Sequence, residues 1–266
     1  MKLPVLLPFL LLIGSRAAAP EGQAAFDQGL QELAARNWDK ALDLLETAVT
    51  ADPDDVRYGS EYRRAAILRA QSLHGPEGKP EDFDRPIKFF QQIVTKNPTA
   101  ANAFLNYGLA YVDKIPVVDA LTRVSVANAA LAQFSKSLEL RPSWAGYYTR
   151  GTSYLFWPRF FGRVKLGVAD LETAVKMQST GPKKPYFSHA WIALGEGYWK
   201  MDRLDKARAA WNEGLKEFPD TPALRERLRL QGDDLKALIQ SKFDFKKRVD
   251  TDLKNLWLYP DPATPR

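Results

Sequence analysis

Apolar and small residues return every three or four positions along most of this chain, and prolines interrupt the pattern at nearly even distances. The pattern is clearest in 188–221, where two runs of helical periodicity flank a short polar turn and Pro219 closes the second run. This periodicity predicts two amphipathic helices joined by a turn. Because each helix has one apolar stripe, a single pair cannot cover its own apolar surface and needs similar neighbours.

The same landmarks recur in four earlier stretches, so the pattern predicts five helix pairs. We place the units at about 22–55, 58–98, 101–142, 144–182 and 188–221. The prolines that close them, at positions 53, 98, 142, 182 and 219, are 45, 44, 40 and 37 residues apart, whereas an uninterrupted unit has about 34 residues. The earlier units therefore carry insertions, which we expect in the connections between helices.

The insertions differ in composition and therefore in expected structure. The second unit contains the turn-rich stretch GPEGKPEDFD before Pro86. The third has about ten additional residues, apolar and without glycine, which predict a lengthened second helix. The fourth inserts WPRFFGR at 157–163, where three aromatic residues and two arginines share one connection.

These features resemble the tetratricopeptide repeat (TPR), and the chain is similar to exported bacterial members of that superfamily over about 22–222. The resemblance is weakest in the second unit, where Ala66 and Pro86 replace the usual glycine and alanine. It implies an all-α, TPR-type helical solenoid, a right-handed superhelix of about five helix pairs with C-terminal capping helices. The residues that carry it in the fifth unit are Trp191, Leu194, Gly195, Tyr198, Ala207, Trp211 and Pro219.

We divide the chain into four parts from these patterns. Residues 1–19 are predicted to be a signal peptide, 20–222 the TPR-like repeat domain, 223–259 capping helices and 260–266 a disordered tail. Capping elements are expected because the last unit of a solenoid exposes an apolar face unless a further helix with a polar outer side covers it.

The first residues have the composition of a secretory signal: Lys2, an apolar run from Leu3 to Ile13, and a small-residue end. The run is too short to span a bilayer. Cleavage after Ala17 and cleavage after Ala19 both fit the pattern. We therefore expect a periplasmic or secreted protein without an integral membrane anchor once the signal is removed.

Composition narrows the function further. The 266 residues are 45% hydrophobic, which is enough for a core without metals or disulfides, and the chain has no cysteine for a disulfide or a lipid anchor. The net charge of +6, which falls to +4 when Lys2 and Arg16 leave with the signal, is mild. It does not indicate a nucleic-acid partner, and we expect no cofactor.

The TPR resemblance implies that the first helix of each unit lines a concave surface. By position these residues are apolar with a few polar points, which favours an apolar helix or an extended peptide as ligand over a terminal carboxylate. An alternative is that they pack against the insertions or the terminal helix. The predicted groove residues are Asn102, Leu105, Leu109, Tyr148, Thr152, Phe156, His189, Ile192, Glu196 and Trp199.

The connection 157–163 is a second candidate site, because functional residues are concentrated on loops. One interpretation is a finger that binds a partner. The other is that the aromatic residues fill the widened space between the helices of the fourth unit, since exposing them together favours aggregation. The candidate residues are Trp157, Arg159, Phe160, Phe161 and Arg163.

The residue types needed for catalysis or metal binding are missing or scattered. His74 and His189 lie in different units with no cysteine nearby, so we expect no metal site. There is no glycine-rich phosphate loop and no Gly-x-Ser-x-Gly nucleophile elbow. The acidic residues Asp52, Asp54 and Asp55 flank Pro53 and suit turn and helix-start roles.

The sequence therefore predicts a non-catalytic exported scaffold or adaptor that holds a protein or peptide in an apolar concave groove. The alternative is an accessory protein that sequesters a small hydrophobic solute for an envelope transporter. A groove open at both ends would favour the peptide, whereas a closed apolar pocket of about 300 to 1,000 Å³ would favour the solute. Self-association through an apolar face also stays open.

Overall fold

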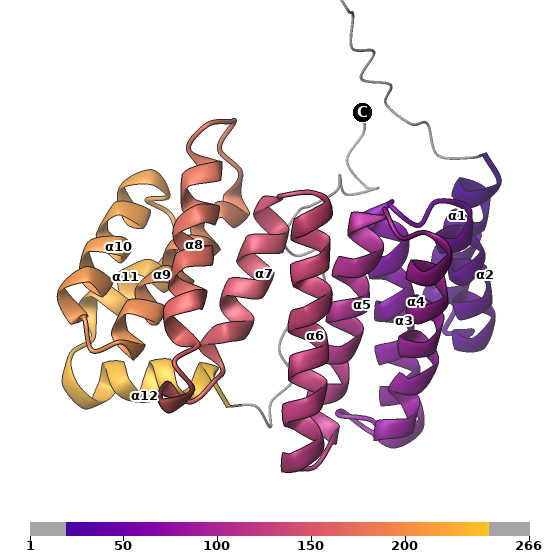
Figure 1. Ribbon diagram of the computed structural model, residues 1–266, viewed down its shortest axis with the longest axis horizontal. Helices are drawn as coiled ribbons and strands as arrows, with labels where there is room; N and C mark the ends of the chain where they lie inside the picture. Colours follow the sequence, from indigo (N-terminus) through magenta and orange to yellow (C-terminus); the bar gives the residue numbers. More distant parts are fainter. Residues whose placement is uncertain (1–19, 245–266) are drawn as a thin grey trace, which may run out of the picture.

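The computed structural model describes residues 20–244, and every regular element in that range is helical. The helices follow one another side by side, from α1 at the right of Figure 1 to α10 at the left. The predicted solenoid of five helix pairs with capping helices is confirmed. The pairs are α1 (Pro20–Ala34) with α2 (Trp38–Ala51), α3 (Val56–His74) with α4 (Asp84–Lys96), α5 (Ala101–Lys114) with α6 (Ala120–Leu140), α7 (Trp144–Leu155) with α8 (Val164–Gln178), and α9 (Ser188–Lys200) with α10 (Leu204–Glu217).

Two further helices cover the last pair. α11 (Pro222–Arg229) and α12 (Gly232–Lys242) bury Leu224, Leu235 and Ile239 against α9 and α10. α12 lies crosswise beneath the last pairs (Figure 1). Of the predicted capping segment, 245–259 lies outside the described residues, as do the predicted tail and the predicted signal peptide.

The insertions form the short helices between the main ones. The turn-rich stretch of the second unit leads into η1 (Pro80–Phe83), and the third unit contains η2 (Ile115–Val117). η3 (Arg159–Phe161) belongs to the α7–α8 connection, and η4 (Pro185–Phe187) precedes α9. The predicted lengthening is confirmed, because α6 has 21 residues whereas α10 has 14.

Acidic residues start helices and join units, as the sequence indicated. The Asp55 side chain accepts a hydrogen bond from the Arg57 amide and caps α3. The carboxylate of Asp54 accepts from the Asn102 amide at 2.8 Å and from both terminal nitrogens of Arg141, at 2.7 and 3.0 Å. Asp54 therefore ties the turn after α2 to the start of α5 and the end of α6.

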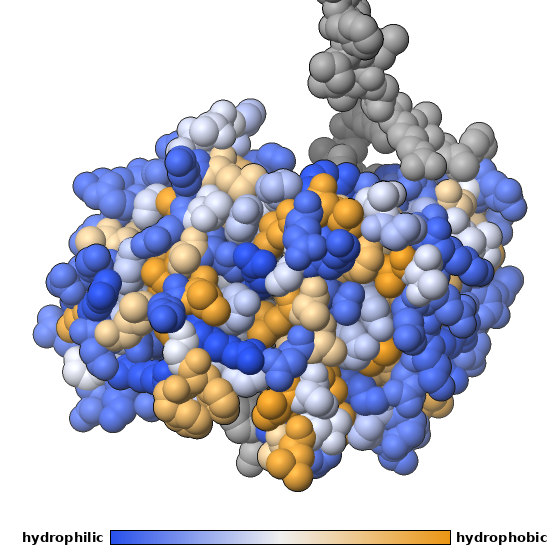
Figure 2. All heavy atoms as spheres, in the orientation of Figure 1, coloured by the Kyte–Doolittle hydropathy of each residue, from blue (hydrophilic) through white to orange (hydrophobic). Residues whose placement is uncertain are grey.

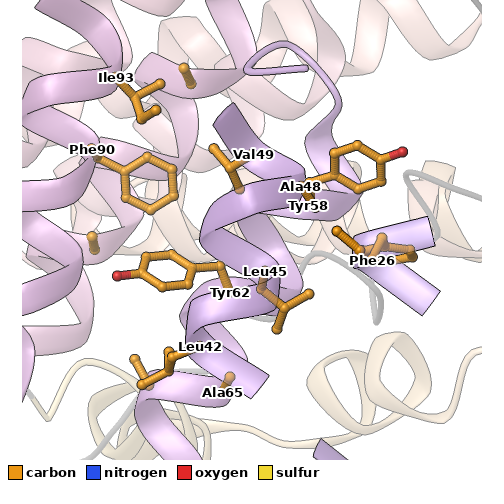
Figure 3. Close-up of a cluster of buried hydrophobic side chains, with 14 of the residues drawn as sticks. Phe26, Leu42, Leu45, Ala48, Val49, Tyr58, Tyr62, Ala65, Phe90 and Ile93 are labelled. Atoms are coloured by element: carbon orange, nitrogen blue, oxygen red, sulfur yellow. The ribbon is translucent and has the colours of Figure 1, made fainter. Parts of the chain in front are cut away.

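The core is a series of contacts between neighbouring pairs. Figure 3 shows the first of these clusters, in which side chains of α1, α2, α3 and α4 converge. The rings of Phe26 and Tyr58 lie 4.8 Å apart, and the Tyr62 hydroxyl donates to Glu46 at 2.6 Å. Burial, followed by this hydrogen bond to a carboxylate, raises the pKa of Tyr62 well above its ordinary value.

In every pair except α3 with α4, a glycine on the first helix faces a large side chain on the second. A Cβ at Gly195 would lie 2.0 Å from Nε1 of Trp211, and a Cβ at Gly108 would lie 2.4 Å from Cε1 of Phe134. Both aromatic side chains are fully buried. The missing Cβ is thus what allows the helices of a pair to pack around the aromatic ring.

Substitution of Gly195 by alanine is expected to destabilise the fold. The added methyl must displace Trp211, whose indole Nε1 donates to the Ile192 carbonyl at 3.2 Å, and overpacking of this kind costs about 1–3 kcal/mol. Urea unfolding followed by circular dichroism measures the loss. Gly181→Ala is the matched control, because nothing lies within 4 Å of a Cβ there; equal unfolding midpoints for the two variants would refute the packing argument.

Candidate functional site

A cavity of about 810 Å³ lies between the third, fourth and fifth helix pairs and the end of α12. We call it the groove. Leu109 and Val112 of α5 and several residues of α6 form one wall. The remaining walls are formed by Tyr148, Thr152 and Phe156 at α7, by His189, Ile192 and Glu196 of α9, and by Lys242 and Phe243 at α12.

Two hydroxyls of the α7 wall are already used as hydrogen-bond donors inside their own helix. The Thr152 hydroxyl donates to the Tyr148 carbonyl at 2.8 Å, and the Ser153 hydroxyl donates to the Thr149 carbonyl at 2.7 Å. These hydroxyls can still accept a hydrogen bond, but they have no hydrogen left to donate. The wall therefore presents chiefly methyl groups and rings to a ligand.

The acidic residue of the groove is held by the capping helices. Glu196 is 5% exposed, and its carboxylate accepts from Nε and Nη2 of Arg227 at 2.9 and 2.5 Å. The Lys242 ammonium lies 3.5 Å from the same carboxylate. Because a buried carboxylate is costly without such partners, these contacts neutralise the charge of Glu196 and join α9 to α11 and α12.

The insertions line the groove and leave it open. Pro116 follows α5, Val124 lies near the start of α6, and Phe161 lies in η3; all three contact the cavity. Leu121 and Phe160, the chain neighbours of the lining residues Ala120 and Phe161, are 87% and 83% exposed. Figure 2 shows hydrophobic side chains gathered at the lower edge of the molecule, over the start of α6 and near the α7–α8 connection.

Most of the predicted groove residues lie together, and three do not. Leu105 is 1% exposed and belongs to the core, so it cannot contact a ligand. Asn102 is used within the fold, since its side-chain amide donates to the Asp54 carbonyl at 2.7 Å. Trp199 lines a separate cavity of about 460 Å³ near α12. The residues that line the groove are Leu109, Tyr148, Thr152, Phe156, His189, Ile192 and Glu196.

In the connection 157–163, some residues fill the space between helices and others are exposed, so each of the two interpretations describes part of it. Trp157 is buried and lines the groove, with the Arg163 guanidinium 3.7 Å from its ring centre and Nη1 of Arg163 donating to Asn128 at 2.7 Å. Arg159 pairs with Asp202. Phe160 and Phe161 stay exposed beside the mouth, 83% and 49%, so the connection both fills a space and offers an apolar surface.

Sequence reasoning missed the walls built by α6 and α12. Ala127 and Leu131 of α6 line the groove although they belong to the second helix of a unit, because the lengthened α6 extends alongside α7. Phe243 packs against Phe156 with ring centres 5.3 Å apart. The apolar character of the third insertion was the available signal for α6, whereas the position of Phe243 depends on how α12 crosses the array.

Comparison with known families supports the repeat architecture. The tetratricopeptide repeat family matches residues 188–230, the segment from the start of α9 to the end of α11. The fifth helix pair and α11 thus form a segment of tetratricopeptide-repeat type. Its α11 therefore occupies the place of a first helix in a sixth unit and covers α10 as such a helix would.

Curated relatives resemble part of this chain. Over 136 residues it is 27% identical to serine/threonine-protein phosphatase 5 of Homo sapiens, and the protein of that name in Rattus norvegicus matches to the same extent. The alignments cover 50% of this chain and 24% of each relative. The chain thus spans about a quarter of the length of the curated relatives it matches.

Solved structures share the fold at low sequence identity. TTC0263, a thermophilic TPR protein in Thermus thermophilus, has a TM-score of 0.53 and 22% identity, over 78% of this chain and 96% of that one. MamA from Desulfovibrio magneticus RS-1 has a TM-score of 0.48 and 15% identity, over 77% and 100% of the two chains. The first similarity shows that the TPR arrangement of helices is shared.

Two further observations concern the part of the chain that the structure describes. Between residues 20 and 244, no three His, Asp or Glu side chains gather closely enough to hold a metal ion. None of the helices in that range combines the length and the apolar character needed to cross a membrane.

Lys200 lines the separate cavity of about 460 Å³, together with Trp199 and Phe243. Its ammonium donates to the Leu155 carbonyl and lies 4.4 Å from the ring centre of Phe243. Burial, assisted by the positive charge of Arg159, lowers the pKa of Lys200 to about 8. A lysine with a pKa lowered in the folded state disfavours folding while it is charged, so stability should rise with pH between about 8 and 10.

Lys200→Met is expected to remove this rise. In the wild type, the unfolded chain holds the Lys200 proton above pH 8 whereas the folded chain releases it, so raising the pH favours folding. Urea unfolding at several pH values between 7 and 10 measures the unfolding free energy of both proteins. As the pH rises, the wild type should gain stability relative to the Lys200→Met variant. Lys176→Met, on the exposed face of α8, is the control; a constant difference for the Lys200 variant would contradict the shift.

Proposed function

We propose that this protein is a non-catalytic scaffold that binds an apolar segment of a partner protein in the groove. The observation that carries the proposal is a cavity of about 810 Å³ with chiefly apolar walls, in which the hydroxyls of Thr152 and Ser153 and the carboxylate of Glu196 are bonded within the fold. Such a surface recognises shape and apolar area, because a polar ligand would lose hydrogen bonds to water without replacement.

The rim favours a protein over a small molecule. Val124 and Phe161, which line the cavity, and their neighbours Leu121 and Phe160 are 46% to 87% exposed, and we call these four residues the rim. A small ligand inside the cavity would leave them in water, whereas a polypeptide running over the rim would bury them. An amphipathic helix suits this site, since its apolar stripe could enter the groove and its flanks could cover the rim.

The volume of the cavity supports a second candidate. About 810 Å³ falls within the range of about 300 to 1,000 Å³ typical of small-molecule sites. A hydrophobic solute held for an envelope transporter would fill the inner part of the groove. In that case Leu121 and Phe160 would have no role in binding, which separates the two candidates experimentally.

We place this function outside the cytoplasm, in the periplasm or in the secreted fraction. The support is the composition of 1–19, where Lys2 precedes an apolar run and a small-residue end, as in a secretory signal peptide. No nucleic-acid partner is proposed. Binding of a second copy of the chain through the exposed rim is a further form of protein binding.

Thr152→Arg is expected to reduce partner capture at least tenfold. The arginine would fill the groove and bring an unpaired charge against apolar walls. Thr47→Arg is the matched control, because Thr47 is an exposed α2 residue whose hydroxyl makes the same kind of intrahelical bond, to the Asp43 carbonyl at 3.1 Å.

Crosslinking in the envelope, followed by affinity purification and quantitative mass spectrometry of proteins and of extracted small molecules, measures the effect. Circular dichroism melting checks that both variants fold. Leu121→Asp with Phe160→Asp distinguishes the candidates, because it should reduce capture of a protein and spare that of a solute. Unchanged capture by the Thr152 variant would exclude the groove as the binding site.

The mature chain is expected to begin at residue 18 or 20. Cleavage after Ala17 or Ala19 would produce these ends, and intact-mass measurement of the protein recovered from a bacterial periplasm distinguishes them. Recovery of the chain only in the cytoplasm, with Met1 retained, would overturn the proposed export.

A further inference from the structure

The described chain ends inside its own groove. Ser241, Lys242, Phe243 and Asp244 all line the cavity, and the Phe243 ring sits between the Phe156 ring, at 5.3 Å, and the Lys200 ammonium, at 4.4 Å. The chain therefore enters the groove at Phe243, and the sequence that follows starts at the cavity mouth and not at a distant surface.

The sequence beyond this point has the pattern that an apolar groove accepts. In 245–259, which lies outside the described residues, Phe245, Val249, Leu253 and Leu256 recur at helical spacing. They fall on one face of a helix, whereas the lysines at 247 and 254 fall on the opposite face. Asp244 is of a type that commonly caps a helix N-terminus.

The length of the segment matches the span of the site. Fifteen residues in a helix extend about 22 Å. Neighbouring packed helices lie about 8–10 Å apart, so the distance from α9 across α7 to α5 is about 16–20 Å. A helix that starts at Phe243 could thus pass over all three first helices that line the groove.

We propose that residues 245–259 bind the groove of the same molecule and act as a built-in competitor of the partner. The inference rests on the proposed function, because it concerns the regulation of that same groove. A tethered segment has an effective concentration of about a millimolar or more at a nearby site. An outside segment then binds only when it outcompetes the tethered one, so the groove selects strong apolar ligands and stays covered without them.

Binding of the attached segment also explains how the free protein can carry an open apolar cavity without aggregating. An open cavity with a rim of exposed Leu121 and Phe160 side chains favours aggregation. Occupation by the chain's own apolar face removes that surface from water in the free protein. The other occupants, a second copy of the chain or an unrelated protein, lack the fixed starting point that Phe243 provides.

Distance measurement between spin labels tests the position of the segment in the full chain. The protein has no cysteine, so Val124→Cys with Lys254→Cys places labels only at the groove rim and on the polar face of the segment. We expect one narrow distance population of about 20 Å or less, two helix diameters. A broad population at longer distances would overturn the proposal, and a population that appears only at high protein concentration would assign the groove to a second copy.

Binding of the apolar fluorescent dye 8-anilinonaphthalene-1-sulfonate tests the competition. Val249→Asp with Leu253→Asp should free the groove and tighten dye binding about tenfold or more. Thr251→Asp with Asn255→Asp adds the same charge away from the apolar face and should leave dye binding unchanged. Equal dye binding by the two variants and the wild type would overturn the competition.

The two proposals can fail separately. A short label distance with no partner captured by the Val249 and Leu253 variant would refute the proposed function and leave the docked segment standing. Partner capture by the groove together with a broad label distance would refute the docked segment alone. If the aspartate variant does not fold, the label distance in the otherwise native chain decides the matter.

Discussion

The close approach of the two helices in four of the five pairs is the constraint on which the rest of this structure depends. At Gly195 and Gly108 the space of a Cβ is taken by the buried rings of Trp211 and Phe134, and at Gly29 and Gly151 it is taken by the buried side chains of Leu45 and Leu171. Because these side chains fill the interior of their pairs, the outer stripe of each helix is free to pack on the next pair. Stacking follows from that geometry, and so does the curved array of first helices that forms the groove.

The groove owes its boundaries to departures from the regular repeat. The lengthened α6 provides a wall that a unit of ordinary length would lack, and the α7–α8 connection places Trp157 inside and Phe160 outside. The capping helices close the other end. Their attachment depends on the buried pair of Glu196 and Arg227, so the polar residue of the groove stabilises the solenoid and the surface left for a ligand is apolar.

The fold was largely predictable from the sequence because helical periodicity and closing prolines are local signals. Five pairs and the long α6 follow from apolar spacing and from the distribution of glycine and proline. The site was predictable only in part. Residues such as Tyr148 and Ile192 line the groove as their repeat positions imply, but Leu105 is in the core and Trp199 faces another cavity, since the insertions and α12 change which faces stay open.

By itself the sequence determined the repeating helix pair, the chemistry of its faces and the absence of any cysteine, because each of these is carried by residues close together in the chain. Only the tertiary structure decided where an open surface remains. The contact between Phe156 and Phe243 joins residues 87 positions apart in the sequence, and the contact between Glu196 and Arg227 joins residues 31 positions apart. Such contacts are set by how the units stack, which no local pattern of apolar and polar residues encodes.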